Sequence, residues 1–87
     1  MEQKKRLDSK VLIGKTIVSK SGKKFGEVGD ILYEAQTGEI ISLVLANPTV
    51  YTEKVNLEKS EEGELLIPYS AVISIGDFMV VSDDELL

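Results

Sequence analysis

The sequence predicts a small all-β domain, a five- to six-stranded β-barrel with one short helical turn near residues 68–71. Three observations support this fold class. A chain of 87 residues is long enough for a single core. Its apolar runs are rich in β-branched and aromatic residues and show no helical period over 11 or more positions. Turn signals separate these runs, and closing so small a sheet would remove exposed strand edges.

The expected strands follow these turns in order. The first two flank Gly22, which can adopt the positive φ that a tight reversal requires. Gly38 ends the loop "EAQTGE" at the left-handed position of a bulged hairpin, and "GEIISLVLA" returns as the third strand. Residues 47–63 form a polar excursion in which a short strand at 52–57 is an option. The last strands are expected at 65–67, 72–75 and 78–81, divided by a turn that starts at Pro68 and by Gly76-Asp77.

The second strand carries unusual residues, namely Gly26, Gly29 and Asp30. If Val28 and Ile31 both point inward, strict alternation is broken and Gly29-Asp30 must form a bulge. Asp30 is then expected to accept hydrogen bonds from backbone N–H groups that have lost their ladder partners. The alternative is that Asp30 binds a metal with Glu27 or Glu34, although the spacing matches no known metal motif.

The composition excludes much of enzyme chemistry. The chain has no Cys and no His, so it lacks disulfides, thiolate zinc sites and the commonest general base. Ser70 lies in a predicted turn without a G-x-S-x-G motif, and no phosphate-binding loop is present. We therefore predict no enzymatic activity, no catalytic residue, no cofactor and no metal site.

Charge is distributed unevenly along the chain. Eight of the ten basic residues lie in the first 24 positions against two acids, so this part carries +6 and residues 25–87 carry −11. Either the first hairpin pairs with acidic neighbours or the basic end docks on a polyanion or an acidic protein. We expect a flexible arm at 1–10, the domain at 11–82 and a fraying acidic tail at 83–87. No secretory signal or membrane span is predicted, which favours a cytoplasmic protein without direct membrane insertion.

The runs "LIGKTIVSKSGKKFGEVGDILYEAQTGEIISLVL" and "LLIPYSAVISIGDFMVV" resemble the PRC-barrel domain, a module named after the photosynthetic reaction centre H subunit. The matching elements occur in the family's order over Val11 to Val81. They are Gly14, Gly22, Gly26-x-Val28-x-Asp30, Thr37-Gly38, Ile67-Pro68 and Ile75-Gly76-Asp77. The short form is similar to stand-alone archaeal versions. Two departures are Glu34-Ala35-Gln36, where the family often has Asp-Pro, and Ile73, where it often has a charged residue.

The resemblance implies a non-enzymatic adaptor that docks on a larger assembly through a protein partner, with archaeal cell division as one setting known for such proteins. A second implied class is RNA processing or ribosome assembly, since the bacterial ribosome maturation factor ends in a similar barrel. The acidic body disfavours RNA, because phosphate contacts need clustered Lys and Arg. A small-ligand or metal-responsive barrel is the third class.

Apolar residues occupy both faces of several predicted strands. Ile41, Leu43 and Leu45 share one face of the third strand, and Ile40, Ser42 and Val44 share the other. In the closing strands we assign Leu65, Ile67, Val72, Ile75, Phe78 and Val80 inward, and Leu66, Ile73, Met79 and Val81 outward. Because a monomer should alternate more cleanly, we predict a homodimer, with exchange of strands as a variant of it. The predicted interface consists of Ile40, Val44, Leu66, Ile73 and Met79. The alternative is a monomer with a second small core under the 47–63 excursion.

Overall fold

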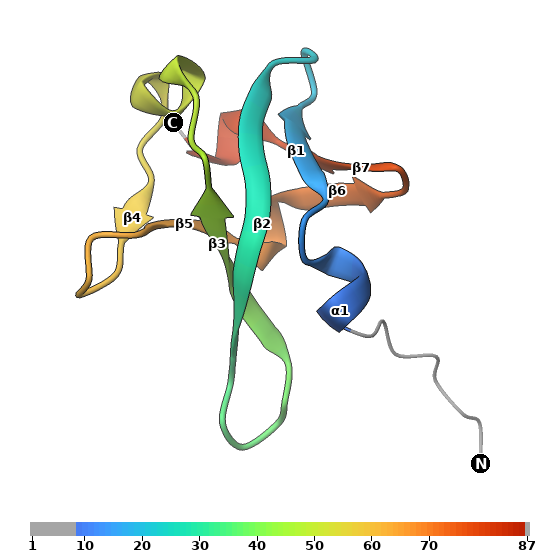
Figure 1. The fold of residues 1–87 in the computed structure, drawn as a ribbon, viewed down its shortest axis with the longest axis vertical. Helices are drawn as coiled ribbons and strands as arrows, with labels where there is room; N and C mark the ends of the chain where they lie inside the picture. The colour runs from blue at the N-terminus through green and yellow to red at the C-terminus, as the bar shows by residue number, and fades with distance from the viewer. Residues whose placement is uncertain (1–8, 87) are drawn as a thin grey trace.

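The computed structural model describes residues 9–86. Within this range it contains seven strands and four helices of a single turn (Figure 1). The strands are β1 (Thr16–Ser19), β2 (Lys24–Tyr33), β3 (Ile40–Ala46), β4 (Glu58–Lys59), β5 (Leu65–Pro68), β6 (Val72–Ile75) and β7 (Phe78–Val81). The helices are α1 (Ser9–Leu12) and the 3-10 helices η1 (Val50–Lys54), η2 (Tyr69–Ala71) and η3 (Asp83–Leu86).

The strands form one sheet in the order β4-β5-β3-β2-β1-β7-β6. Neighbouring strands are antiparallel except β1 and β7, which pair in parallel. The all-β class and the helical turn near 68–71 are confirmed. The strand number is seven because β4 adds a two-residue strand. Over residues 9–86, β4 and β6 are the two ends of this order and do not pair with each other. They are therefore edge strands, and the sheet does not close into a ring.

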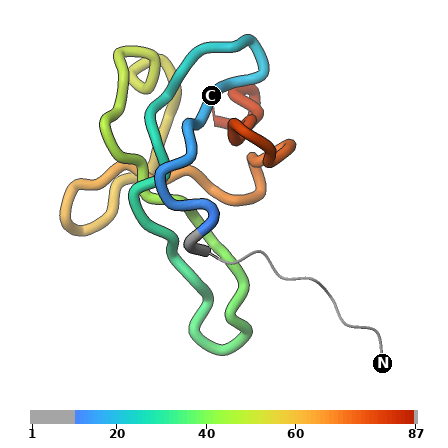
Figure 2. The backbone as a smooth tube through the Cα atoms, turned by 45° about the vertical axis from the view of Figure 1, so that its right-hand side comes forward, coloured from blue at the N-terminus to red at the C-terminus, as the bar shows by residue number. Residues whose placement is uncertain are grey.

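The sheet is strongly bent, and its longest element extends beyond the rest. β5, β6 and β7 run across the direction of β2 and β3 (Figure 1). The hairpin of β2 and β3 projects from the body, as the views in Figures 1 and 2 agree. Its turn contains Gly38 at φ +75°, as predicted. The Glu34 carboxylate accepts hydrogen bonds from the N–H groups of Gln36 (2.7 Å) and Thr37 (3.2 Å), which orders the turn without the family's Asp-Pro.

The predicted bulge in β2 is confirmed. Val28 pairs with Leu45 and Asp30 pairs with Val44, so Gly29 is the extra residue. Val28 and Ile31 are both buried on the core side. The Oδ1 atom of Asp30 accepts a hydrogen bond from the Ile31 N–H at 2.8 Å, which is the structural role predicted for this carboxylate.

A second irregularity changes the face of Ile40. Ser42 pairs with Leu32 and Ile40 pairs with Tyr33, which leaves Ile41 as an extra residue in β3. Ile40 consequently packs against the core, while Ile41 is half exposed. The predicted grouping of Ile40 with Val44 on the outward face, and of Ile41 with Leu43 and Leu45 on the other face, is wrong. The extra residue reverses the facing of the side chains before it relative to those after it.

The facing of β7 is also opposite to the prediction. Met79 and Val81 are fully buried, whereas Phe78 is 55% exposed. The parallel register sets this facing, since Met79 lies beside the buried Ile17 and Val81 beside the buried Ser19 of β1. The outward assignment of Met79 and Val81 and the inward assignment of Phe78 and Val80 are therefore wrong.

The segment between β3 and β4 forms a 3-10 helix instead of the optional strand at 52–57. Thr49 caps η1, because its side chain accepts a hydrogen bond from the Tyr51 N–H. The Thr49 N–H donates to the Phe25 carbonyl at 3.0 Å, and this contact ties the excursion to β2. Val55 and Leu57 then pack against the main core, so the apolar residues of the excursion join one cluster rather than form a second core.

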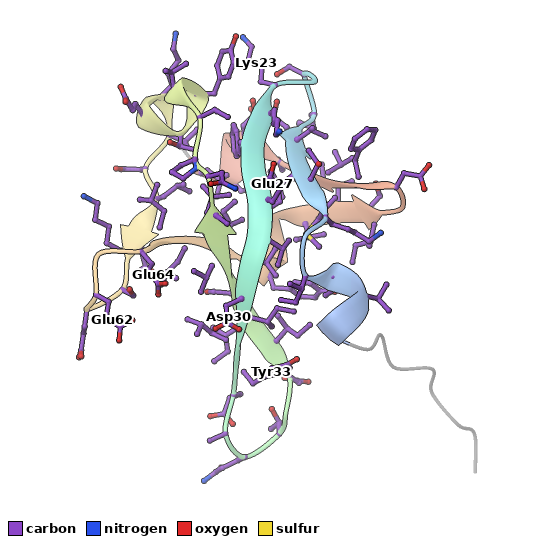
Figure 3. The ribbon with its side chains drawn as sticks, in the orientation of Figure 1. Lys23, Glu27, Asp30, Tyr33, Glu62 and Glu64 are labelled. Carbon is purple, nitrogen blue, oxygen red and sulfur yellow. The ribbon has the colours of Figure 1, made fainter. Side chains whose placement is uncertain are left out.

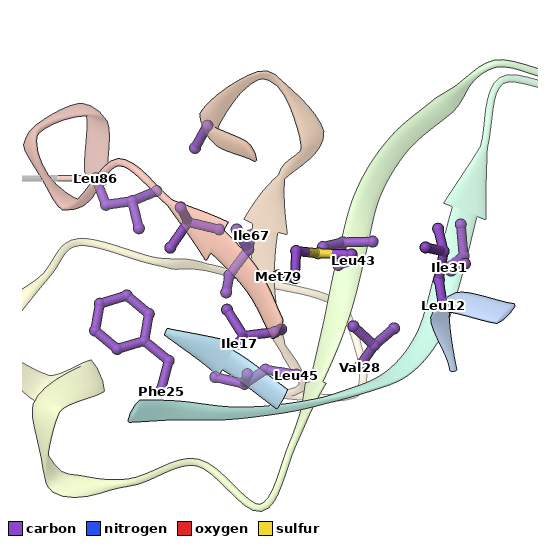
Figure 4. Packing of buried hydrophobic residues seen from close by; sticks show 12 residues of the cluster. Leu12, Ile17, Phe25, Val28, Ile31, Leu43, Leu45, Ile67, Met79 and Leu86 are labelled. Carbon is purple, nitrogen blue, oxygen red and sulfur yellow. The ribbon is translucent and has the colours of Figure 1, made fainter. Parts of the chain in front are cut away.

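Both ends of the described chain contribute to this core. Figure 4 shows Leu12 beside Ile31 at one end and Leu86 near Phe25 at the other. Leu86 is only 3% exposed, and its carbonyl accepts a hydrogen bond from the Asn56 N–H. The prediction of a fraying tail is wrong over Asp83–Leu86, because Leu86 fills the core. Of the predicted flexible arm at 1–10, positions 1–8 lie outside the described residues, and positions 9 and 10 begin α1.

Phe78 and Met79, two neighbouring residues of β7, provide a test of which side chains of this strand point into the core. Met79→Ala is expected to lower the free energy of unfolding by about 2–5 kcal/mol, because it leaves a cavity in the core. Phe78→Ala is expected to lower it by under about 1 kcal/mol, because the ring is half exposed. Urea unfolding at dilute protein concentration measures both values. Equal losses for the two variants would contradict the facing described here.

Two glycines with positive φ provide a second test. A Cβ at Gly26 (φ +151°) would lie 2.5 Å from the Ala46 carbonyl oxygen, whereas a Cβ at Gly22 (φ +90°) would meet nothing within 4 Å. Gly22→Ala should cost about 1–2 kcal/mol of stability from backbone strain alone. Gly26→Ala should cost at least twice as much, since the clash is with backbone that cannot rotate away. Thermal unfolding of the two variants checks this order.

Candidate interaction surface

An apolar face lies on the outside of β1, β7 and β6. Because Ile17, Met79 and Val81 point into the core, the alternate residues of these strands point outward. Thr16 pairs with Phe78 and Val18 pairs with Val80 across the parallel ladder. We call this surface the β1–β7–β6 outer face and define it by Thr16, Val18, Ile73, Phe78 and Val80, none of which is charged.

Ile73 and Phe78 are its most exposed members. Ile73 is the extra residue of a bulge between Val72 and Ser74 in β6, and it is 53% exposed. Its neighbour Val72 packs against the core, so Ile73 projects away from it. Ile73 lies near Val80 and Val81, whereas Phe78 lies at the β6–β7 turn, so the two side chains are at different places along β7. Exposed aromatic residues such as Phe78 are enriched at surfaces that bind a partner.

The structure does not bring the five predicted interface residues together. Ile73 is exposed, as expected. Leu66 is half-buried on β5, and Ile40 packs against the core. Val44 is 5% exposed between Asp30 and Leu66 in the sheet, and Met79 is in the core. Only Ile73 of the five is an exposed residue.

The sequence does not predict Phe78 as an exposed residue, because its exposure depends on how β7 pairs with a distant strand. The strand Phe78–Val81 is apolar on both faces, so alternation alone cannot say which pair is inside. Its pairing with β1 decides the facing, and these strands lie about 60 residues apart in the chain.

The structural glycines and Pro68 occupy the predicted turns and bulges. Gly22 and Gly38 lie in hairpin turns, and Gly29 is the extra residue of the β2 bulge. Gly76 lies in the β6–β7 turn, where its N–H donates to the Phe78 carbonyl at 2.9 Å. Pro68 ends β5 and precedes η2.

A second exposed apolar group lies on the projecting hairpin. Leu32, Tyr33 and Ile41 are 38%, 47% and 50% exposed. Tyr33 is at the end of β2, where the hairpin leaves the body (Figure 3). These residues lie on the part of the hairpin that extends beyond Glu27, the last residue of β2 that pairs with β1.

Several lysines of the basic N-terminal region are already paired within the chain. Lys20 Nζ lies 2.8 Å from Asp84 Oδ2, and Lys24 Nζ lies 3.0 Å from Glu27 Oε2. Lys23 Nζ is 5.2 Å from the centre of the Tyr51 ring, which is a cation–π distance. These contacts agree with the interpretation that the first hairpin pairs with acidic neighbours.

Two of these charged groups have shifted pKa values. The hydrogen bond from Asn47 Nδ2 (2.9 Å) is the main cause that lowers the pKa of the Glu27 carboxyl, and Lys24 lowers it further. The hydrogen bond to Asp84 is the main cause that raises the pKa of Lys20. Both groups are on the surface, where solvent weakens such interactions.

The carboxylates considered for a metal site have separate partners. Glu27 binds Asn47 and Lys24, Asp30 accepts from Ile31, and Glu34 orders its turn. Over residues 9–86 no group of three or more acidic, His or Cys side chains is placed to hold a metal ion. No helix in the same range is long and apolar enough to cross a membrane.

Comparison with known proteins agrees with this architecture. The family model for the PRC-barrel domain matches residues 7–87, and the chain belongs to this family. An uncharacterized protein of the archaeon Methanocaldococcus jannaschii is 27% identical over 81 residues, covering 93% of this chain and 86% of that protein. The PRC-barrel is a small domain often involved in protein interactions. The match includes Asp83–Leu86, consistent with the packing of Leu86 in the core.

The Glu27 carboxylate yields a prediction about pH. Its folded pKa is below the ordinary 4.5, so its stabilising effect is complete above about pH 4.5 and is lost as pH falls through the folded value. Glu27→Gln should therefore lower the melting temperature slightly near neutral pH, and the difference should vanish in strong acid. Melting curves between pH 2 and 7 measure it, with Glu39→Gln in the exposed turn as the charge-matched control. A difference that grows in acid would contradict this assignment.

Proposed function

We propose that this chain is a non-enzymatic interaction module that self-associates through the β1–β7–β6 outer face and docks on a larger protein assembly. The observation that carries the proposal is the pair of half-exposed apolar side chains, Ile73 and Phe78, on an uncharged sheet face. Burying such side chains in a partner removes apolar surface from water, which favours association.

Membership of the PRC-barrel family supports the proposal of a protein-interaction role. PRC-barrel domains are often involved in protein interactions. The resemblance to stand-alone archaeal members makes the cell-division machinery one candidate assembly. A role without catalysis agrees with the composition, which supplies neither Cys nor His as nucleophile, base or soft metal ligand.

RNA binding and metal sensing, the two alternatives, are less well supported by the described residues than a protein-interaction role. An RNA-binding role needs free cations in a row, whereas Lys20 and Lys24 are bound to carboxylates. A metal-responsive role needs converging ligands, and the three acidic side chains considered for it have separate hydrogen-bond partners.

Self-association is tested by size-exclusion chromatography with light scattering at micromolar concentration. The wild-type chain is expected at twice its monomer mass, and the Ile73→Lys/Phe78→Lys double variant at the monomer mass, because two lysines cannot be buried without partners. Val11→Lys/Ile13→Lys is the matched control, since both residues are similarly exposed on or beside α1. It should remain a dimer. A wild-type monomer, or loss of the dimer in the control alone, contradicts the proposed surface.

A further inference from the structure

A groove lies between η1 and the β4–β5 hairpin, on a part of the sheet distant from β6 and β7. Its volume is about 690 Å³, within the range of sites that bind small molecules or short peptide segments. Its apolar lining includes Leu45 of β3, Leu65 of β5, and Val55 and Leu57 of the connecting segment.

Both walls of the groove are held by hydrogen bonds. On one side, Thr49 connects η1 to β2 through the Phe25 carbonyl, and Thr52 Oγ1 donates to the Thr49 carbonyl at 2.8 Å. On the other side, Ser60 Oγ accepts from the N–H groups of Glu62 (3.2 Å) and Glu64 (3.1 Å), which fixes the hairpin turn. A groove with ordered walls pays less conformational entropy when a ligand binds.

Acidic side chains stand on both walls. Glu53 of η1 and Glu64 of the hairpin line the groove from opposite sides, together with one cation, Lys59. Glu64 and Glu62 are seen on the hairpin in Figure 3. Residues 48–65 contain five Glu and two Lys, a net charge of −3. This surface therefore favours a ligand that carries positive charge.

We propose that the groove binds a short basic peptide segment in which one aliphatic side chain is flanked by Lys or Arg. The aliphatic side chain fills the apolar floor, and a cation on each side reaches the carboxylates of Glu53 and Glu64. Charge-assisted hydrogen bonds between Lys or Arg and a carboxylate are stronger than neutral ones. Because the two carboxylates belong to separate walls, a ligand with two cations can pair with both of them. This inference concerns a different surface from the β1–β7–β6 outer face and does not depend on self-association.

The test uses fluorescein-labelled peptides and the full chain in fluorescence anisotropy. The probe GKRLKG is expected to bind, and its affinity should fall severalfold between 50 and 300 mM NaCl, because salt screens exposed charges. GKRSKG, which lacks the leucine, should bind at least tenfold more weakly, and GEELEG should not bind.

Protein variants locate the site. Glu53→Lys/Glu64→Lys should weaken binding of GKRLKG at least tenfold, whereas Glu34→Lys/Glu39→Lys, the same charge change in the β2–β3 turn, should weaken it less than twofold. Circular dichroism melting confirms that each variant is folded. Ile73→Lys/Phe78→Lys should bind the peptide like the wild type. Loss of peptide binding and loss of self-association can therefore be told apart.

Four outcomes of the binding measurements overturn the proposal. They are equal binding of GKRLKG and GKRSKG, equal loss in the two glutamate double variants, preferential binding of GEELEG, and no binding of any peptide. If Glu53→Lys/Glu64→Lys instead changes the mass seen by light scattering, a second copy occupies the groove and the peptide assignment is also wrong.

Discussion

The bend of β2 at Gly29-Asp30 is the constraint on which the rest of the fold depends. β2 pairs with β1 near its start and with β3 along the remainder, and at Glu27 it is paired with both neighbours, Thr16 and Ala46. An unbent strand would place Val28 and Ile31 on opposite faces, and one of them would leave the core. The Asp30 carboxylate stabilises the bend by accepting from the Ile31 N–H, and Gly26 allows the Ala46 carbonyl to approach closely.

Features set by local chemistry could be predicted from the sequence. The turns at Gly22 and Gly38 and the β2 bulge follow from residue types whose conformational preferences act within a few positions. The family resemblance was also carried by such positions. The turn at Glu34 stays ordered although it lacks the family's Asp-Pro, because the Glu34 carboxylate accepts hydrogen bonds from the N–H groups of Gln36 and Thr37.

Features set by pairing between distant strands could not be predicted. Alternation separates the side chains of β7 into two faces but does not say which face points into the core. The parallel pairing of Met79 with Ile17 decides this. The bulge at Ile41 has no glycine or proline to mark it, so Ile40 was assigned to the wrong face. The acidic neighbours of Leu86 are typical of solvent-exposed ends and predict a tail, yet its side chain packs in the same core cluster as Phe25. The facing of β7, which the sequence leaves open, explains why the sequence predicts Ile73 but not Phe78 as a surface residue.

The order of the sheet separates the two candidate binding surfaces. The groove is lined by residues of β3, β4 and β5 and of the segment that precedes β4, whereas the apolar outer face belongs to β1, β7 and β6 at the opposite end of the order. Their chemistries differ as well, because the outer face has no charged residue and the groove has carboxylates on both walls. The acidic residues 25–87 of a second copy, with a net charge of −11, are repelled by the groove and accommodated by the neutral face. Charge thus favours self-association at one end of the sheet and a basic partner at the other, so a single small domain can hold both at once.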